Sequence, residues 1–279
     1  MRKKLYSLMM ASAFACSAPA FATNEVKPDE VPASLKPALD SGLTVVKHFE
    51  AEAGLKGWVL SQNKGKHVVA YTTQDGKHAI FGALLNDAGA NLTEKFHEEH
   101  APKLDTQALW KAVEGAHWVA EKPAGEVKSI AYIFKDANCT FCHLAWKALQ
   151  PYQAAGMEIR WVPVAFLAES SMDKAGVLLD ARDTKKPSEV DQVIDGLQDD
   201  YAKKAKKAYP KISEGNLAKV ESNNALMREW GFQGTPVTII KDASGEVKVA
   251  EGMFRLGDIP AMSGMAAIEN SDPALKRFE

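Results

Sequence analysis

Cys139-Thr140-Phe141-Cys142 lies where a predicted strand gives way to a predicted helix, and this position decides how the chain is interpreted. Residues 127–134 are a short apolar run typical of a buried strand, and residues 142–149 continue as a helix with one apolar face. The first cysteine therefore stands at a helix N-terminus, where unpaired backbone N–H groups and the positive end of the helix dipole favour a thiolate over a thiol. We expect a low pKa for Cys139, and the thiolate is the nucleophile of disulfide chemistry.

The spacing of the two cysteines suits thiol–disulfide exchange. Side chains three residues apart lie on neighbouring faces of a helix, so the two sulfurs can bond to each other. Cys139 would attack a substrate disulfide or an oxidised thiol, and Cys142, one turn further on and less exposed, would resolve the mixed disulfide. A protonated His143 beside the pair would lower the Cys139 pKa further. Since a stabilised thiolate favours the dithiol state, the Cys139–Cys142 disulfide should be readily reduced, and we expect no cofactor besides this redox-active disulfide.

Gly234-Thr235-Pro236-Val237-Thr238 places a proline at the start of an interior-looking strand. Proline is a poor choice there unless the backbone must turn sharply or must lack a donor. A cis Thr235–Pro236 bond would do both, because it would expose the Thr235 backbone to an extended substrate segment and keep an amide N–H away from the sulfurs. An ordinary trans proline is the commoner arrangement when this stretch is taken alone. Downstream of a redox CxxC pair, we expect cis.

Residues 1–22 have the three parts of a secretory signal: basic Arg2-Lys3-Lys4, an apolar stretch, and Ala20-Phe21-Ala22 as a small-residue cleavage site. We expect cleavage after about Ala22. The remaining chain has 31 basic and 36 acidic residues, a formal net charge of −5. It shows no basic stripe interleaved with aromatic residues, so nucleic acid is not an expected partner. No other apolar run approaches the roughly 18 residues that a membrane span needs.

Two cysteines remain once Cys16 is removed with the signal, and both belong to the motif. In an exported protein such a pair could be a structural staple. Two intervening residues close so small a loop that little chain entropy is removed, and the staple would stabilise weakly. A redox role is favoured, while a non-enzymatic chaperone with a stapled pair stays open as an alternative.

Residues 23–90 are expected to form a first domain. A short helix around residues 34–41 precedes four strand-like runs separated by turn residues, at 43–49, 57–60, 67–72 and 79–85. Four short strands make a thin sheet with a face to cover, and a partner subunit is an obvious cover.

Residues 91–123 are expected to be a helical linker, with a helix from about residue 93 to residue 119. His97 and His100 stand three apart on this helix with glutamates between them. Their spacing is not that of a zinc-protease helix and no third ligand is evident, so we expect a solvated polar face and no metal site.

Residues 124–279 are expected to form the second domain. The order is strand, helix, strand, a helical block broken near Pro187 and Pro210, a strand hairpin and a last helix, at residues 127–134, 139–150, 157–164, 172–230, 236–250 and from about 256. This is the order of a thioredoxin-like domain with a helical insertion, so the whole chain is predicted to be α+β.

Together these features resemble the DsbC/DsbG family of periplasmic thiol:disulfide interchange proteins of Gram-negative bacteria. The resemblance rests on Cys139 to Cys142, on Thr235-Pro236, and on the N-terminal sheet module with its helical connector. Residues 75–80 and 86–92 resemble the DsbG branch, as does the lack of cysteine outside the motif after the signal. Thr140-Phe141 departs from the family, which usually has Pro-Tyr or Gly-Tyr there. Redox poise is sensitive to these two positions, so Thr140 and Phe141 are expected to tune it.

The resemblance implies a cystatin-like N-terminal dimerisation domain and a V-shaped homodimer whose two thioredoxin-like arms face a shared cleft. It implies disulfide reductase and isomerase activity in the periplasm, reduction of sulfenylated cysteines, and chaperone activity as a further option. A DsbD-type membrane reductase would keep the cysteines reduced, and the substrates would be oxidised or misfolded periplasmic proteins. By the same resemblance Cys139 is the nucleophile, Cys142 the resolving thiol, and Thr235 and Pro236 the loop that contacts the substrate.

Two other functions match parts of the sequence. Cys139 to His143 also fits the CxxCH attachment site of c-type haem, but haem attachment has no use for a preceding buried strand or a distant Thr-Pro loop. A DsbA-like thiol oxidase shares the motif and an inserted helical block. Such an oxidase would not need the residues before Pro123, so the dimeric, reductive reading is favoured.

Overall fold

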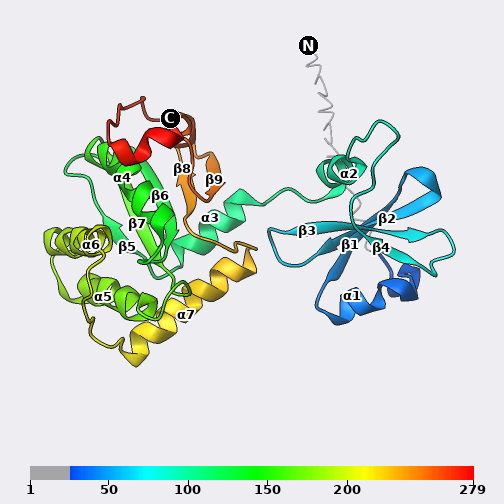
Figure 1. Ribbon diagram of the computed structural model, residues 1–279, viewed down its shortest axis with the longest axis horizontal. Coiled ribbons are helices and arrows are strands. Elements are labelled where there is room, and N and C mark those ends of the chain that lie inside the picture. Colours follow the sequence, from blue (N-terminus) through cyan, green and yellow to red (C-terminus); the bar gives the residue numbers. More distant parts are fainter. Residues whose placement is uncertain (1–25) are drawn as a thin grey trace, which may run out of the picture.

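The computed structural model describes residues 26–279, so the predicted secretory signal at residues 1–22 lies outside the described part of the chain. The described chain folds around two β-sheets, one of four strands and one of five, with helices packed on each (Figure 1). The fold is therefore α+β, as expected. Between residues 26 and 279, no helix is both long enough and apolar enough to cross a bilayer.

The first sheet is an antiparallel meander in the order β1-β2-β3-β4. Because side chains alternate between the faces of a strand, its apolar residues form two small cores. Trp58, Leu60 and Ala70 pack with Leu35 on one face, and Val69 and Tyr71 pack on the other face against the helix α2. The elements are 3-10 turns at Pro28–Glu30, Ala33–Leu35 and Glu52–Gly54, α1 (Lys36–Asp40), β1 (Thr44–Glu50), β2 (Leu55–Ser61), β3 (His67–Thr73), β4 (Ala79–Phe81) and α2 (Leu92–His100).

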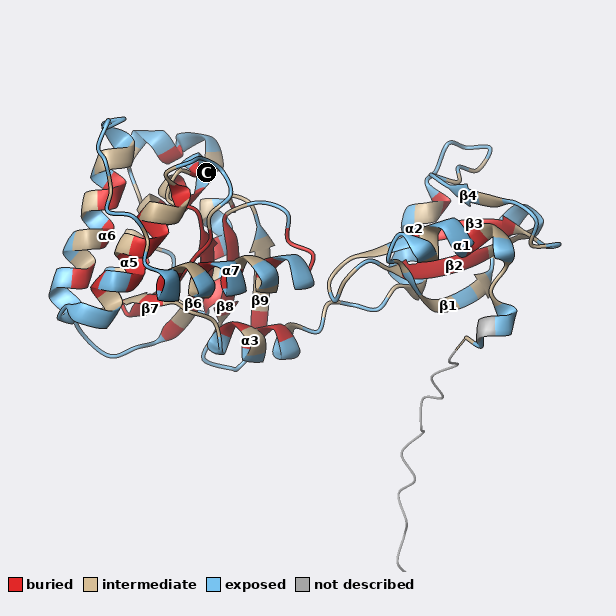
Figure 2. Cartoon of the chain, turned by 90° about the horizontal axis from the view of Figure 1, so that it is seen from below, coloured by how far each residue is buried: buried red, intermediate tan, exposed pale blue. Residues whose placement is uncertain are grey.

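The edge strand β4 is shorter than the expected strand at residues 79–85. After Phe81 the chain leaves the sheet and forms a loop, in which the Asn86 side chain accepts hydrogen bonds from the backbone N–H groups of Ala88 and Ala90. Ile80 and Phe81 remain 47% and 53% exposed, and Figure 2 marks β4 at the edge of this sheet. β4 is therefore an exposed apolar edge of this sheet, and β1 forms the opposite edge.

The single helix expected over residues 93–119 is wrong. The structure has α2, then an irregular stretch at residues 101–105, then α3 (Thr106–Glu114) and the strand β5 (Val119–Glu121). Pro102 cannot continue a helix, and Asp105 starts a new one by accepting a hydrogen bond from the Ala108 N–H at 2.9 Å. The end of the expected linker is thus part of the second sheet, and α3 is part of its core.

The second sheet has the order β5-β7-β6-β8-β9, with β6 parallel to β7 and the other neighbours antiparallel. The helices α4, α5, α6 and α8 cover one face, and α3 and α7 cover the other (Figure 1). The elements are β6 (Ser129–Lys135), α4 (Thr140–Ala154), β7 (Met157–Pro163), α5 (Ser171–Thr184), α6 (Pro187–Ala202), α7 (Glu214–Glu229), β8 (Val237–Lys241), β9 (Val247–Glu251), α8 (Ile259–Ser263), and 3-10 turns at Leu256–Asp258 and Pro273–Phe278.

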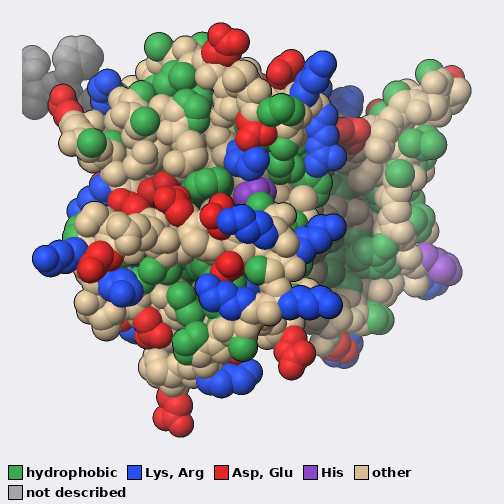
Figure 3. All heavy atoms as spheres, turned by 60° about the vertical axis from the view of Figure 1, so that its left-hand side comes forward, with side chains coloured by type: hydrophobic (Ala, Val, Ile, Leu, Met, Phe, Trp, Pro, Cys, Tyr) green, Lys and Arg blue, Asp and Glu red, His purple; other side chains and the backbone are tan. Residues whose placement is uncertain are grey.

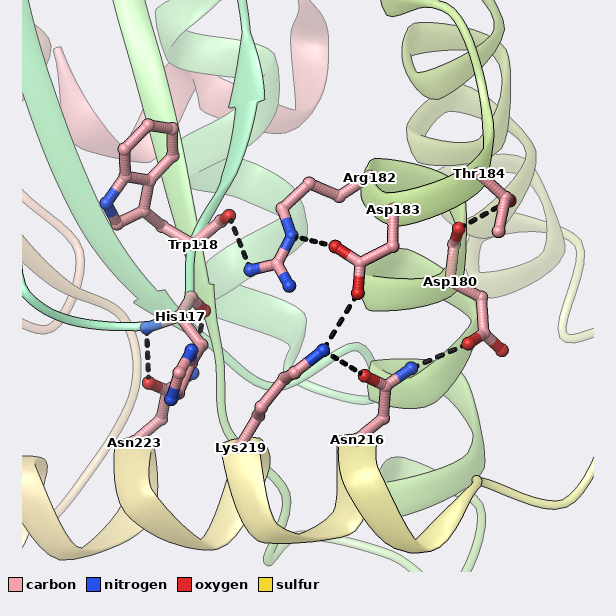
Figure 4. A network of polar contacts seen from close by, with 9 residues as sticks. All are labelled: His117, Trp118, Asp180, Arg182, Asp183, Thr184, Asn216, Lys219 and Asn223. Carbon is pink, nitrogen blue, oxygen red and sulfur yellow. Dashed lines mark hydrogen bonds and ion pairs between the residues drawn. The ribbon is translucent and has the colours of Figure 1, made fainter.

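A polar network fixes the inserted helices to the segment before β5 (Figure 4). Asp183 on α5 pairs with Lys219 on α7 at 2.8 Å and with Arg182 at 2.6 Å. The Asn223 side chain on α7 donates to the His117 backbone oxygen and accepts from the His117 N–H. These bonds hold the helical insertion against the segment that precedes the edge strand β5.

The four-stranded sheet with α1 and α2 forms a first unit, and the five-stranded sheet with α3 to α8 forms a second unit. The turn between β2 and β3 contacts the second unit at the end of α7. The Lys64 N–H donates to the Glu229 backbone oxygen at 2.9 Å, and its ammonium pairs with the Glu229 carboxylate at 2.5 Å. Gly65 lies so close to the Trp230 backbone oxygen that a Cβ at this position would collide with it. A glycine is therefore required where the hairpin meets the end of α7.

Candidate active site

The two cysteines lie at the N-terminus of α4, directly after the loop that follows β6. Cys139 is the N-cap residue, and its sulfur accepts a hydrogen bond from the Cys142 N–H at 3.1 Å. Both cysteines are unbonded thiols. Cys139 is 6% exposed, whereas Cys142 is completely buried, so a large partner can reach only the first sulfur.

The Thr235–Pro236 peptide bond is cis, as the sequence predicted. It precedes β8, the neighbour of β6 in the sheet, and this pairing brings the loop against the start of α4. The Cys139 sulfur donates to the Thr235 backbone oxygen at 3.2 Å. The structure therefore brings together Cys139, Cys142, Thr235 and Pro236, the four residues expected to form the site.

The surroundings separate the two thiols in acidity. Hydrogen bonding from the Cys142 thiol is the largest cause that lowers the pKa of Cys139, to about 6, and the Thr235 side chain and the N–H groups of Cys142 and Phe141 lower it further. Burial, and then the hydrogen bond and charge of Cys139, raise the pKa of Cys142 well above its usual value. One cysteine is thus prepared as a nucleophile while the other keeps its proton.

Thr235 serves the two protonation states of Cys139 with different atoms. The thiol donates to the Thr235 carbonyl oxygen, but a thiolate has no proton to donate. The Thr235 hydroxyl is buried and has no other hydrogen-bond partner among the described residues. It is therefore free to donate to the thiolate, which agrees with its lowering of the Cys139 pKa.

The three residues expected to tune the cysteines make separate contacts. The Thr140 hydroxyl bonds to the Tyr201 hydroxyl of α6 at 2.5 Å. Phe141 is 44% exposed and lies beside Phe278 and the Arg277 guanidinium. His143 hydrogen-bonds Gln198 of α6 through Nδ1 at 2.7 Å and also contacts Tyr201. The helical insertion thus touches the motif at two points, and the effect of His143 on the Cys139 pKa stays a prediction.

Asp136 is a residue of the site that the sequence analysis missed. It is completely buried, and its carboxylate accepts four hydrogen bonds, from the N–H groups of Asn138, Phe166 and Leu167 and from the Ser171 hydroxyl. It ties the loop before Cys139 to the loop after β7 and to α5. The sequence signal that could have identified Asp136 is its position, directly after a buried strand and three residues before Cys139.

His97 and His100 lie in the first unit, away from the cysteines. His100 stacks on Phe49 with ring centres 4.0 Å apart, and His97 contacts the His67 backbone oxygen.

On the face drawn in Figure 3, acidic and basic side chains lie interspersed.

Comparisons with known proteins identify relatives of this chain. Residues 120–259 match the family described as the thioredoxin-like domain. DsbG of Pseudomonas aeruginosa is 28% identical over 229 residues, covering 80% of this chain and 85% of that protein. The chain belongs to the thioredoxin-like family, within the DsbG/DsbC group of thiol:disulfide interchange proteins. DsbG of Escherichia coli is 27% identical, covering 81% and 88% of the two chains. The solved structure of Proteus mirabilis ScsC in a compact conformation gives a TM-score of 0.46 at 21% identity, over 61% and 83% of the two chains.

Membership of this family makes the chain a thiol–disulfide oxidoreductase. The two DsbG relatives match beyond residues 120–259, since each alignment covers about four fifths of the chain. The c-type haem alternative does not fit the site. Haem attachment would need space for a porphyrin beside both sulfurs, and Cys142, in the first turn of α4, is completely buried.

Proposed function

We propose that the protein is a periplasmic disulfide reductase and isomerase that also reduces sulfenylated cysteines in client proteins, with chaperone activity as a further role. The observation that carries this proposal is the position of Cys139, with its lowered pKa, 3.2 Å from the carbonyl oxygen of Thr235 beside cis-Pro236. A nucleophilic sulfur beside a free backbone edge suits a client that is bound as an extended segment.

The proposed reaction has two displacements. The Cys139 thiolate attacks a client disulfide, so that one Cys139–client S–S bond forms and the client's own S–S bond breaks. The Cys142 sulfur then attacks Cys139, which forms the Cys139–Cys142 disulfide and releases the client thiolate. The client gains two electrons and the dithiol loses them. With a sulfenylated client, the first attack breaks the client's S–O bond and expels hydroxide in place of a thiolate, and the hydroxide takes a proton from solvent to become water.

The first unit supports the proposal of a dimer. We propose that the cystatin-like module, residues 23–90, joins two copies through the exposed edge at β4, where Ile80, Phe81 and Leu85 are each about half exposed. The second unit would begin at α3 and not at residue 124, because α3 and β5 belong to its core and sheet. A DsbD-type membrane reductase would return Cys139–Cys142 to the dithiol.

The test is to trap clients with Cys142→Ala, which removes the resolving thiol and leaves the nucleophile. Expressed with its natural leader, this variant should accumulate mixed disulfides in the periplasm, visible on non-reducing gels. The double variant Cys139→Ser, Cys142→Ala is the matched control and should trap nothing. Clients with one cysteine would support reduction of sulfenic acids, and clients with several would support isomerisation. Equal trapping by both variants would disprove the assigned roles.

A further inference from the structure

A buried lysine lies under the cysteine pair. Lys135, the last residue of β6, is 3% exposed, and its ammonium nitrogen has no hydrogen-bond partner within residues 26–279. Burying an unpaired ammonium is unfavourable, because the charge loses its hydration, unless the group gives up its proton. A lysine in this position therefore calls for an explanation beyond packing.

The face of the sheet on which Lys135 lies is fixed by strand alternation. Lys135 shares a face of β6 with Ile133, and Ile133 packs against α4 and against Trp161 of β7. The Lys135 nitrogen lies 4.5 Å from the centre of the Trp161 ring. The Lys135 side chain is therefore directed to the space between the sheet and the first turns of α4, where Cys142 is buried.

Glu121 of β5 completes a buried cluster. It is 4% exposed, and its carboxylate accepts hydrogen bonds from the Trp161 indole N–H and from Gln150 of α4, each at 2.9 Å. Trp161 thus contacts the lysine with its ring and the glutamate with its N–H. The cluster holds an acid and a base in an interior that is otherwise apolar.

The charges around Lys135 place its proton exchange near neutral pH. Burial lowers the pKa of Lys135 to about 8, and groups on the surrounding elements oppose this effect when they are ionised. The thiolate form of Cys142 would oppose it most, followed by Glu121 of β5, Cys139 at the start of α4 and Asp195 of α6. The strongest electrostatic partner of the lysine is therefore the thiol that must lose a proton.

Cys142 needs a proton acceptor, because it reacts as a thiolate and no solvent reaches it. We propose that Lys135 is the base that removes the Cys142 proton when the mixed disulfide is resolved. The neutral Lys135 amine takes the proton from the Cys142 thiol and becomes an ammonium. The Cys142 sulfur attacks Cys139, the new S–S bond forms, and the client leaves with the electron pair of the broken S–S bond. When the disulfide is reduced again, the ammonium returns the proton to Cys142.

This inference rests on the proposed roles of the two cysteines, and one experiment separates the two. Reduced protein is mixed with excess Ellman's reagent in a stopped-flow instrument, and release of the thionitrobenzoate anion is followed. Attack by Cys139 releases one anion and resolution by Cys142 releases a second, in a unimolecular phase. Cys142→Ala should keep only the first phase. If wild-type protein shows no second phase that Cys142→Ala loses, the proposed roles fail before Lys135 is tested.

Two substitutions separate a base from a fixed charge and from a packing role. Lys135→Met keeps the length of the side chain over Trp161 without an amine, and Lys135→Arg keeps a positive charge that cannot be lost. We expect both variants to slow the second phase at pH 7 by about 10²-fold or more, the usual range for general base catalysis, and to leave the first phase within about threefold of wild type. A normal second phase in Lys135→Met, or its recovery in Lys135→Arg, would overturn the inference.

The pH profile of wild-type protein gives an independent measure if either variant fails to fold. The rate of the second phase should rise with pH through an inflection at or below about 8, the pKa of Lys135. Glu121→Gln removes a negative charge that favours the ammonium, so it should move this inflection to lower pH. A profile without that inflection, or one that Glu121→Gln leaves in place, would also overturn the inference.

Discussion

The sulfur of Cys139 lies 3.2 Å from the backbone oxygen of Thr235, a residue 96 positions further along the chain. The two are brought together by the pairing of β6 with β8, which sets the cysteine loop beside the cis-proline loop. Neither α4 nor β8 makes the site alone. The Cys139 sulfur and the Thr235 backbone lie side by side only because the sheet aligns the ends of β6 and β8.

The acidity of Cys139 predicts its reactivity with alkylating agents. Since its pKa is lowered to about 6, the rate of modification by iodoacetamide should reach half its maximum near pH 6. Mass spectrometry of the reduced protein gives this profile, and buried Cys142 should stay unmodified. In Cys142→Ala the midpoint should move to higher pH, because the thiol that donates to Cys139 is gone. A midpoint near the ordinary cysteine value of about 8.5 would contradict the low pKa.

The Thr235 hydroxyl should stabilise the Cys139 thiolate. Thr235→Val keeps the shape and removes the hydroxyl, so the Cys139 pKa should rise by about one unit, the equivalent of one hydrogen bond to a charged group. The reduction potential should fall, because a less stable thiolate favours the dithiol less. Thr235→Ser retains the hydroxyl and should stay close to wild type in both measurements. Equal values in the valine and serine variants would remove this role.

Asp136 should be a main determinant of local stability. Asp136→Asn replaces one accepting oxygen by a donor and leaves buried N–H groups unpaired, so the free energy of unfolding should fall by about 3 kcal/mol. Urea denaturation followed by tryptophan fluorescence measures it. Ser171→Ala removes one of the four donors to Asp136 and should cost about 1 kcal/mol. A loss no larger in Asp136→Asn than in Ser171→Ala would show that the carboxylate is not the anchor.

The network around Asp183 should give a small, pH-dependent contribution to stability. Hydrogen bonds from Arg182 and then Lys219 lower the pKa of Asp183 to about 2. A lowered pKa in the folded state stabilises the fold above the unfolded value of 3.8, and this contribution is lost as the pH falls through about 2. Because Asp183 is 40% exposed, Asp183→Asn should cost only about 0.5 kcal/mol at pH 7.

The matched control for this network is Asp87→Asn, at an exposed turn of the first unit. It should leave the urea midpoint unchanged at pH 7. At pH 2 the difference between Asp183→Asn and wild type should shrink. A loss of the same size at pH 7 and pH 2 would mean that the charge of Asp183 is not its cause.

The edge of the first sheet should hold the dimer together. Ile80→Asp puts a charge on the exposed β4 edge. If Ile80 is a central contact, the dissociation constant of the dimer should rise by about 10²-fold or more, because a few central residues carry most of the binding energy at an interface. Sedimentation at micromolar concentration distinguishes monomer from dimer. Val127→Asp alters another exposed apolar residue, in the second unit, and should leave association unchanged. Wild-type protein that sediments as a monomer would contradict the proposed dimer.

Local sequence sufficed where the chemistry depends on neighbours in the chain. The strand before Cys139 and the helix after it were readable from apolar pattern, and these two elements alone place the cysteine at a helix N-terminus. The cis bond before Pro236 was predictable only together with the upstream CxxC pair, since the Thr-Pro stretch taken alone favours a trans bond. The apolar periodicity of residues 93–119, in contrast, concealed the break at Pro102 and the strand β5.

Tertiary structure alone decided which distant groups share an environment. The sequence alone would place Lys135, a lysine at the end of a strand, on the surface. It is buried because β5, β7 and α4 enclose it. Asp136 became an anchor because the loop after β7 supplies two N–H groups. The residue types and their order fix the reactive pair, but the acidity of each group depends on burial and partners, and these arise only when the sheet assembles.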